Sequence, residues 1–223
     1  EQLVRLKFPK SRIEVLGIPI DPLFEHLGDP KPLCEKHGVD PDLPLIILSG
    51  GAFGVMSGGD MAQMLSGITQ PCNLAIVCGN NKKLQETIRK HIEANPIDNI
   101  NYHVLGFTKE MHEWMAMASL FIGKPGGLST SECLACGLPM LIWNPIPGQE
   151  VFNSVYLLEN GAAFHPDNIT TLPYRIDELL KDPEKLERMK QNARTLGRPT
   201  AARDIVNHAI EHVDEGVIHI SHA

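Results

Sequence analysis

The sequence predicts an α/β fold in which one open parallel sheet of six strands carries helices on both faces. Short apolar runs rich in Leu, Ile and Val alternate with longer segments of helical periodicity. This alternation is typical of parallel sheets, whose strands are buried on both sides. It is repeated six times along the chain and then gives way to helical segments alone.

The predicted strands are short and strongly apolar, as in "LPLIILS", which indicates burial on both faces of a sheet. They cover residues 44–49, 73–79, 101–106, 119–124, 138–144 and 161–165.

Helical periodicity fills the segments between these strands. We expect helices near residues 58–68, 81–94, 108–118, 129–136 and 149–159. Thr108 is expected to be an N-cap, since Met111, Trp114 and Met115 follow it at the spacing of one helix face. Three more helices are predicted in residues 171–182, 183–197 and 200–213, with Pro183 at a helix start and Gly197 at its end.

The first part of the chain is expected to be a linker. Residues before Pro19 and Pro22 are biased toward extended backbone, and residues 23–43 show no strong periodicity. We therefore divide the chain into an interdomain linker with a lead-in segment (1–43), a sheet domain (44–198), and a C-terminal crossing helix with a tail (199–223).

Composition limits the function. The 27 acidic and 20 basic residues give a net charge of −7, which argues against a general nucleic-acid binder. No apolar run approaches the roughly twenty residues that cross a bilayer. Five cysteines, an odd number in a chain of 223 residues, favour reduced thiols and a cytoplasmic setting. The chain opens without Met or a signal-peptide pattern, so we expect it to be a piece of a longer protein.

Ligands of open parallel sheets bind at the carboxyl ends of the strands, and four loops there are unusual. The first, "SGGAFGV", offers Gly50 and Gly51 for close backbone approach to a phosphate, although a tight turn explains the glycines equally well. It matches neither the dinucleotide-binding G-x-G-x-x-G pattern nor a Walker loop. The second, "LGFTKE", places Phe107 and Thr108 at a strand end, where the ring or its backbone can meet a planar base.

The third loop, "GKPGGLSTSE", joins a buried strand to a helix start. Its amides and hydroxyls suit a phosphate, and Glu132 one turn later suits a diol such as a ribose. The alternative is a capping box in which Glu132 bonds back to its own helix start. The fourth loop, "NPIPGQEVFN", carries Gln149, Glu150 and Asn153, an amide and carboxylate set that suits sugar hydroxyls. Together the four loops predict a site for a nucleotide diphosphate that carries a sugar.

These motifs resemble a known family. "KPGGLSTSECLACGLPMLIWNPIPGQEVFN", "SGGAFGV" and "GFTKEMHEWMAMASLFIGKPGG" are similar to the C-terminal half of the monogalactosyldiacylglycerol synthase and processive diacylglycerol glucosyltransferase family, and more distantly to the lipid II N-acetylglucosaminyltransferase. The resemblance implies a Rossmann-like half of a two-domain GT-B fold and a UDP-sugar donor. The implied contacts are uracil near Phe107 and Thr108, ribose on Glu132, phosphates on Gly50, Gly51, Gly126, Gly127, Leu128, Ser129 and Thr130, and sugar hydroxyls on Gln149, Glu150 and Asn153.

The same resemblance implies an inverting transfer of glucose or galactose to a diacylglycerol-like lipid. Its acceptor site and catalytic base are expected in an N-terminal domain outside this chain, so the catalytic residue is unknown and the chain alone is expected to be inactive. Glu150 as the base is a weaker alternative to donor recognition. The resemblance further implies a protein on the cytoplasmic side that contacts the membrane only peripherally. We expect no cofactor and no tightly bound metal, since none of the four loops carries an Asp-x-Asp motif.

Three other functions stay open at this point. A UDP-N-acetylhexosamine 2-epimerase would share the fold and donor, and a non-catalytic nucleotide-sugar binding module would share the site. A dehydrogenase is weaker, because no acidic residue stands where the ribose ligand of a dinucleotide fold is expected. Cys133 and Cys136 form a C-x-x-C, which we interpret as two structural thiols because neither a second pair nor a His cluster lies nearby in the sequence.

Overall fold

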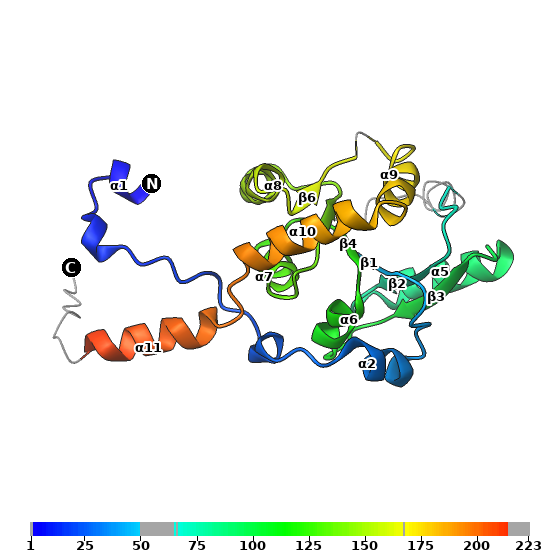
Figure 1. Ribbon diagram of the computed structural model, residues 1–223, viewed down its shortest axis with the longest axis horizontal. Coiled ribbons are helices and arrows are strands. Elements are labelled where there is room, and N and C mark those ends of the chain that lie inside the picture. Colours follow the sequence, from blue (N-terminus) through cyan, green and yellow to red (C-terminus); the bar gives the residue numbers. More distant parts are fainter. Residues whose placement is uncertain (1, 50–64, 66, 167, 214–223) are drawn as a thin grey trace.

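The computed structural model describes residues 2–49, 65, 67–166 and 168–213, and its centre is a parallel sheet (Figure 1). Its strands are β1 (Leu45–Ser49), β2 (Cys72–Val77), β3 (Ile100–Leu105), β4 (Leu120–Gly123), β5 (Met140–Ile142) and β6 (Ala163–Phe164). They run in the order β3-β2-β1-β4-β5-β6, and every neighbouring pair is parallel. The predicted fold class and all six predicted strands are confirmed.

The described helices follow the predicted alternation, with additions at the N-terminus. They are α1 (Gln2–Arg5), α2 (Pro30–His37), α5 (Lys82–Ala94), α6 (Met111–Met117), α7 (Gly127–Ala135), α8 (Gln149–Glu159), α9 (Leu172–Leu180), α10 (Pro183–Leu196) and α11 (Ala201–Val213). Short 3-10 turns lie at Lys10–Arg12 and Pro22–Glu25. The predicted helix at 58–68 falls mostly outside the described residues.

Alternate residues of each strand pack on opposite faces of the sheet. In β1, Ile46 and Leu48 belong to a core that also holds Ile88 of α5 and Ile176 of α9. The intervening residues face a second core that contains the following residues of α2, α6, α7 and α8: Cys34, Trp114, Met115, Cys133, Leu134 and Leu157. Both faces of the sheet are therefore covered, which explains why most of its strands are continuous apolar runs; the edge strand β3 is more polar.

Two helix starts differ from the prediction. Helix α6 begins at Met111 after Glu110, and Thr108 is therefore not its N-cap; the Thr108 hydroxyl instead accepts a hydrogen bond from the Glu110 N–H at 3.0 Å. Helix α7 begins at Gly127, two residues earlier than expected, because the glycine pair forms the helix start itself.

Helix α2 is a further correction, since residues 23–43 showed no strong periodicity. Asp29 caps it by accepting from the Lys31 N–H at 3.1 Å, and Gly38 ends it in the left-handed conformation at φ 65°. A charged cluster joins it to α6: the Lys36 ammonium lies 2.9 Å from Glu110 and 2.6 Å from Glu113. The His37 ring lies 2.6 Å from the same Glu113 carboxylate.

The N-terminal segment and α11 project from the same side of the sheet domain (Figure 1). They meet the domain where Gly17, at φ 100°, packs against Arg198 and Ala201. An ion pair of 2.9 Å between Arg203 and Glu25 adds a second contact. Helix α10 runs from Pro183 to Leu196 with Gly197 as its C-cap, as predicted. No helix in the described part of the chain combines the length and the apolar character that crossing a membrane requires.

Candidate functional site

The carboxyl edge of the sheet is the candidate site, because the strand order reverses there between β1 and β4. Neighbouring strands whose connections leave in opposite directions open a crevice, and open parallel sheets bind ligands in it. The loop after β4 lies at this point. Gly50 and Gly51, which follow β1, fall outside the described residues, so their predicted phosphate contact stays a prediction.

The turn from β4 into α7 is built around close approaches that glycine permits. A Cβ on Gly123 would lie 2.8 Å from the Phe121 ring and 3.1 Å from Ser49 Cβ, so β4 passes β1 too closely for a side chain. Gly126 is the N-cap of α7, in extended conformation, and no side chain caps the helix. The amides of its first turn therefore have no intrahelical acceptor and no capping side chain, which is the arrangement that binds anions.

Four of the predicted phosphate residues, Gly127, Leu128, Ser129 and Thr130, lie in this first turn. Gly127 opens the helix, and the Ile18 side chain comes within 3.4 Å of the position of a Cβ there. Leu128 is exposed, and Ser129 is partly exposed. The Thr130 amide donates to the Gly126 carbonyl at 2.9 Å, so the helical ladder begins at that residue. The Thr130 hydroxyl is buried and has no hydrogen-bond partner among the described residues.

Glu132 does not form the capping box that was the alternative to ribose binding, since α7 has no side-chain cap. Burial raises the pKa of its carboxyl above the usual value, and the nearby Asp21 raises it further. A carboxylate in this situation gains from any ligand that donates hydrogen bonds to it. Asp21 comes from the linker, a neighbour that the sequence analysis did not anticipate.

The start of α8 faces the α7 turn. Gly148, at φ 100°, precedes the helix, a conformation that a residue with a side chain rarely adopts. The Glu150 carboxylate accepts from the Ile146 N–H, and its other oxygen lies 3.8 Å from the position of a Cβ on Gly126. Asn153 donates to the Pro125 carbonyl at 2.8 Å and so ties α8 to the turn.

The structure thus brings the predicted phosphate turn at the start of α7 close to the predicted sugar-binding residues at the start of α8. Gln149 is exposed at the first position of α8, next to Glu150, and both belong to the same corner as Gly126. Phe107 and Thr108 are at the same edge but beyond β1 and β2, because they follow β3 at the end of the sheet. The Phe107 ring is 68% exposed, so it is not part of the core and a planar group can reach it.

Of the C-x-x-C cysteines, Cys133 is buried and Cys136 is partly buried, and both are free thiols. Burial raises the pKa of Cys136 to about 12 and that of Cys133 well above the ordinary value. Thiols that stay protonated at neutral pH are poor nucleophiles and poor metal ligands. This agrees with the structural interpretation of the pair.

Comparisons with known proteins identify the family. Residues 61–196 match the family model described as "Glycosyl transferases group 1". A processive diacylglycerol beta-glucosyltransferase of Staphylococcus saprophyticus is 35% identical over 193 residues, which are 86% of this chain and 48% of that protein. The chain therefore spans about half the length of the curated relatives it matches.

Solved structures share the fold. MurG of Acinetobacter baumannii superposes with a TM-score of 0.61 at 22% identity, over 90% of this chain and 58% of MurG. A UDP-GlcNAc 2-epimerase from Neisseria meningitidis, solved with UDP-GlcNAc bound, superposes with a TM-score of 0.63 at 15% identity, over 94% of this chain and 58% of the epimerase. The fold is thus one half of GT-B, and the chain belongs to the group 1 glycosyltransferase family.

Proposed function

We propose that this chain is the donor-binding half of a UDP-hexose-dependent glycosyltransferase that transfers glucose or galactose to a diacylglycerol-like lipid. The observation that carries the proposal is the uncapped N-terminus of α7, which stands at the crevice of the sheet. Glu132 lies further along the same helix, and a Glu150 oxygen lies 3.8 Å from the position of a Cβ on Gly126. The relatives named as diacylglycerol glucosyltransferases support the lipid acceptor and the hexose.

The predicted site residues at the carboxyl ends of the strands each have a role in this proposal. The free first-turn amides of α7, from Gly127 to Ser129, receive the diphosphate together with Gly50, Gly51 and Gly126, and Thr130 closes this turn. Glu132 accepts from the ribose hydroxyls, and uracil stacks or bonds near Phe107 and Thr108. Gln149 and Glu150 bind the sugar hydroxyls. Asn153 supports them by holding the Pro125 turn, to which its amide donates.

Transfer then depends on how the leaving UDP is stabilised. The acceptor hydroxyl attacks the anomeric carbon in line, the bond to the diphosphate breaks, and the configuration inverts. Amides and a helix dipole that already point at the departing phosphate stabilise its charge without reorganisation, which is a large contribution in many enzymes. We propose that this occurs with no cofactor and no tightly bound metal.

The rest of the reaction lies outside this chain in our proposal. Residues 44–198 form the donor-binding domain, residues 1–43 lead in from the acceptor domain, and residues 199–223 cross back to it. The catalytic base and the lipid site belong to the other half, which also contacts the cytoplasmic membrane surface peripherally. The likeness to 2-epimerases supports only a shared fold, whereas the relatives at 35% identity are named as transferases.

The test is a thermal-shift titration of the chain with UDP, UMP, ADP, GDP and NAD, followed by UDP-glucose and UDP-galactose. A ligand at about a hundred times its Kd adds roughly 2.7 kcal/mol, which moves the midpoint by several degrees in a chain of this size. We expect UDP to exceed UMP and the other nucleotides, and Glu132→Gln to weaken the UDP response. Glu93→Gln, an exposed carboxylate on α5, is the matched control. A response to NAD above UDP would overturn the proposal.

A further inference from the structure

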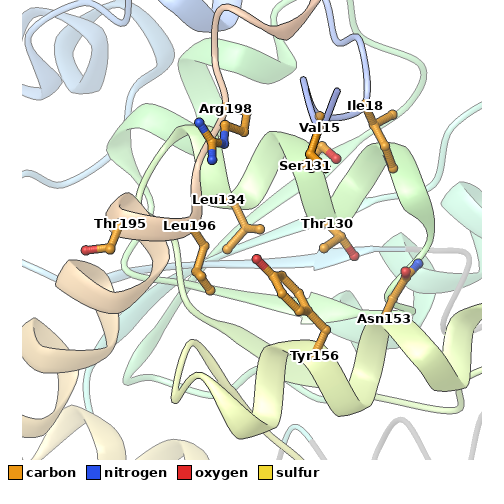
Figure 2. A pocket seen from close by; sticks show the side chains of 11 residues that line it. Val15, Ile18, Thr130, Ser131, Leu134, Asn153, Tyr156, Thr195, Leu196 and Arg198 are labelled. Carbon is orange, nitrogen blue, oxygen red and sulfur yellow. The ribbon is translucent and has the colours of Figure 1, made fainter. Parts of the chain in front are cut away.

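Helix α11 carries a group of metal-ligating side chains outside the candidate site. The chain enters this helix from a junction with the linker, where Arg198 and Val15 line the same pocket (Figure 2). From this junction α11 projects from the sheet domain (Figure 1). The second half of the helix contains His208, Glu211 and His212 on its surface.

These three side chains are close enough to share one ion. Each offers one ligand atom, and the ligand atoms all lie within 4.8 Å of one another. The rings of His208 and His212 are one helical turn apart, and their centroids are separated by 4.2 Å. Ligand atoms that share a zinc ion lie roughly 3–4 Å apart, since each is about 2 Å from the metal. Small rotations of the three surface side chains would therefore bring them to one ion.

One of the histidines is already oriented as metal-binding histidines usually are. Nδ1 of His212 lies 2.8 Å from the carbonyl oxygen of His208. Because a carbonyl only accepts hydrogen bonds, Nδ1 carries the hydrogen, and the lone pair of the neutral ring is on Nε2. Metal-binding histidines nearly always have such a partner at the second nitrogen, since it fixes the tautomer and the direction of the ring. The hydrogen bond thus leaves Nε2 of His212 for a ligand.

The cluster on α11 also lacks a competing cation. A similar set of side chains, His37 with Glu110 and Glu113, lies at the contact between α2 and α6. There the Lys36 ammonium is 2.9 Å from Glu110 and 2.6 Å from Glu113, so a cation is already present. Glu211, in contrast, forms no ion pair with a basic side chain within the described part of the chain. Its charge is available to an ion.

The cluster lies on the polar side of α11. At 3.6 residues per turn, His208, Glu211 and His212 are across the helix from the exposed apolar side chains Val206 and Ile210. A segment that packed against this apolar face would therefore leave the three polar side chains open to solvent and to an ion.

We propose that His208, Glu211 and His212 form a binding site for a divalent transition-metal ion such as Zn²⁺. Two imidazoles and one carboxylate suit such an ion, whereas Mg²⁺ and Ca²⁺ prefer oxygen ligands alone. Three protein ligands leave a further coordination position for water. An ion bound in this way would cross-link adjacent turns and restrain the end of α11. This site does not depend on the proposed donor function.

Isothermal titration calorimetry of the chain with ZnCl₂, in a buffer free of chelators, tests this site. We expect His208→Gln and His212→Gln each to weaken the binding of one Zn²⁺ by roughly tenfold or more, since even a group that only orients a metal ligand contributes roughly 10–100-fold. Replacing the exposed His165 by Gln, outside the cluster, is the matched control and should leave Zn²⁺ binding unchanged. MgCl₂ should give no comparable binding.

Hydrogen exchange with and without ZnCl₂ locates the bound ion. Zn²⁺ should slow the exchange of the amides of residues 208–213 in the unmodified chain and in His165→Gln, but not in His212→Gln. The unmodified chain is a test by itself, because unchanged exchange of these amides at saturating Zn²⁺ would overturn the proposal whatever the variants do. Zn²⁺ affinity that is the same in His208→Gln, His212→Gln and the parent would also overturn it, since the ion would then bind at other residues.

Discussion

At the scale of single residues, Glu132 shows why a binding site can reduce stability. Burial and the neighbouring Asp21 raise the pKa of its carboxyl, so the folded state holds the proton more strongly than the unfolded chain does. The stability that Glu132 contributes therefore falls as the pH rises from the ordinary pKa of a glutamate, near 4.5, to the raised pKa of this carboxyl. At neutral pH the ionised carboxylate costs stability that a bound diol would restore.

Replacing this charge should make the free protein more stable. Glu132→Gln is expected to raise the midpoint of thermal unfolding at pH 7 by about 1–3 °C, because the amide avoids the cost of burying a charge. The gain should shrink toward pH 4, where the native carboxyl is already protonated. Differential scanning calorimetry at both pH values measures it, with Glu93→Gln as the exposed control. A variant less stable than the parent at pH 7 would show that the carboxylate makes a stabilising contact.

At the residue scale, the sequence could place several candidate residues at the carboxyl edge of the sheet, and their binding roles stay predictions. Gly126, Glu132 and Glu150 follow directly from the rule that ligands bind where parallel strands end. The contacts of these residues could not be predicted from the sequence. Asp21 and the Ile18 side chain reach the site from the linker, and the Pro125 carbonyl reaches it from a turn. Those contacts depend on how distant segments fold back, and no local periodicity encodes that.

At the scale of elements, strands were easier to predict than helix ends. Most strands are apolar runs, β3 with Asn101 and His103 being the exception, whereas the start of α7 depends on two glycines that usually signal a loop. Helix α2 was missed because it buries only Cys34, which leaves almost no apolar periodicity to detect. Its signals were local instead: Asp29 as a cap, Pro30 at the first position and Gly38 at the end.

The contact that holds α2 to α6 should depend on pH. Hydrogen bonds from Lys36 and then His37 lower the pKa of Glu113, so its contribution to stability is present above pH 4.5 and disappears as the pH falls through the lowered value. Glu113→Gln is expected to lower the unfolding midpoint by about 1–3 °C at pH 6 and to have little effect below the lowered pKa. Urea or thermal unfolding at both pH values provides the measurement. An equal loss at the two pH values would mean that packing, and not charge, is responsible.

At the scale of the whole molecule, the sheet domain and α11 differ in how firmly they are held. Helix α10 buries Met189 and Ala193, whereas α11 buries Ala201 at its start and leaves Val206 and Ile210 exposed by 55% and 62%. The sheet architecture could be predicted from the order of strands and helices along the sequence. The position of α11 did not, because its apolar face lacks a partner within the described chain.

Hydrogen exchange should report this difference directly. We expect the amides of residues 205–213 to exchange faster than those of residues 186–194, because local opening is easier where few apolar contacts must break. Arg203→Gln, which removes the ion pair to Glu25, should accelerate exchange in α11, and Arg188→Gln should not. Mass spectrometry of exchanged peptides resolves the two helices. Equal protection in both would show that α11 is held as firmly as the sheet domain.

The order of strands in the sheet has a consequence for biosynthesis. β1 lies in the middle, and Ile46 to Leu48 pair on one side with β2 and on the other with Leu120 to Ile122 of β4. As the chain leaves the ribosome, β2 is available early, whereas β4 follows only after three more elements, α5, β3 and α6. Until then one edge of this apolar strand stays open, and open apolar edges pair with other chains. The nascent chain is therefore most exposed to aggregation before residue 122 has emerged, which makes this interval the stage at which a chaperone would have the greatest effect.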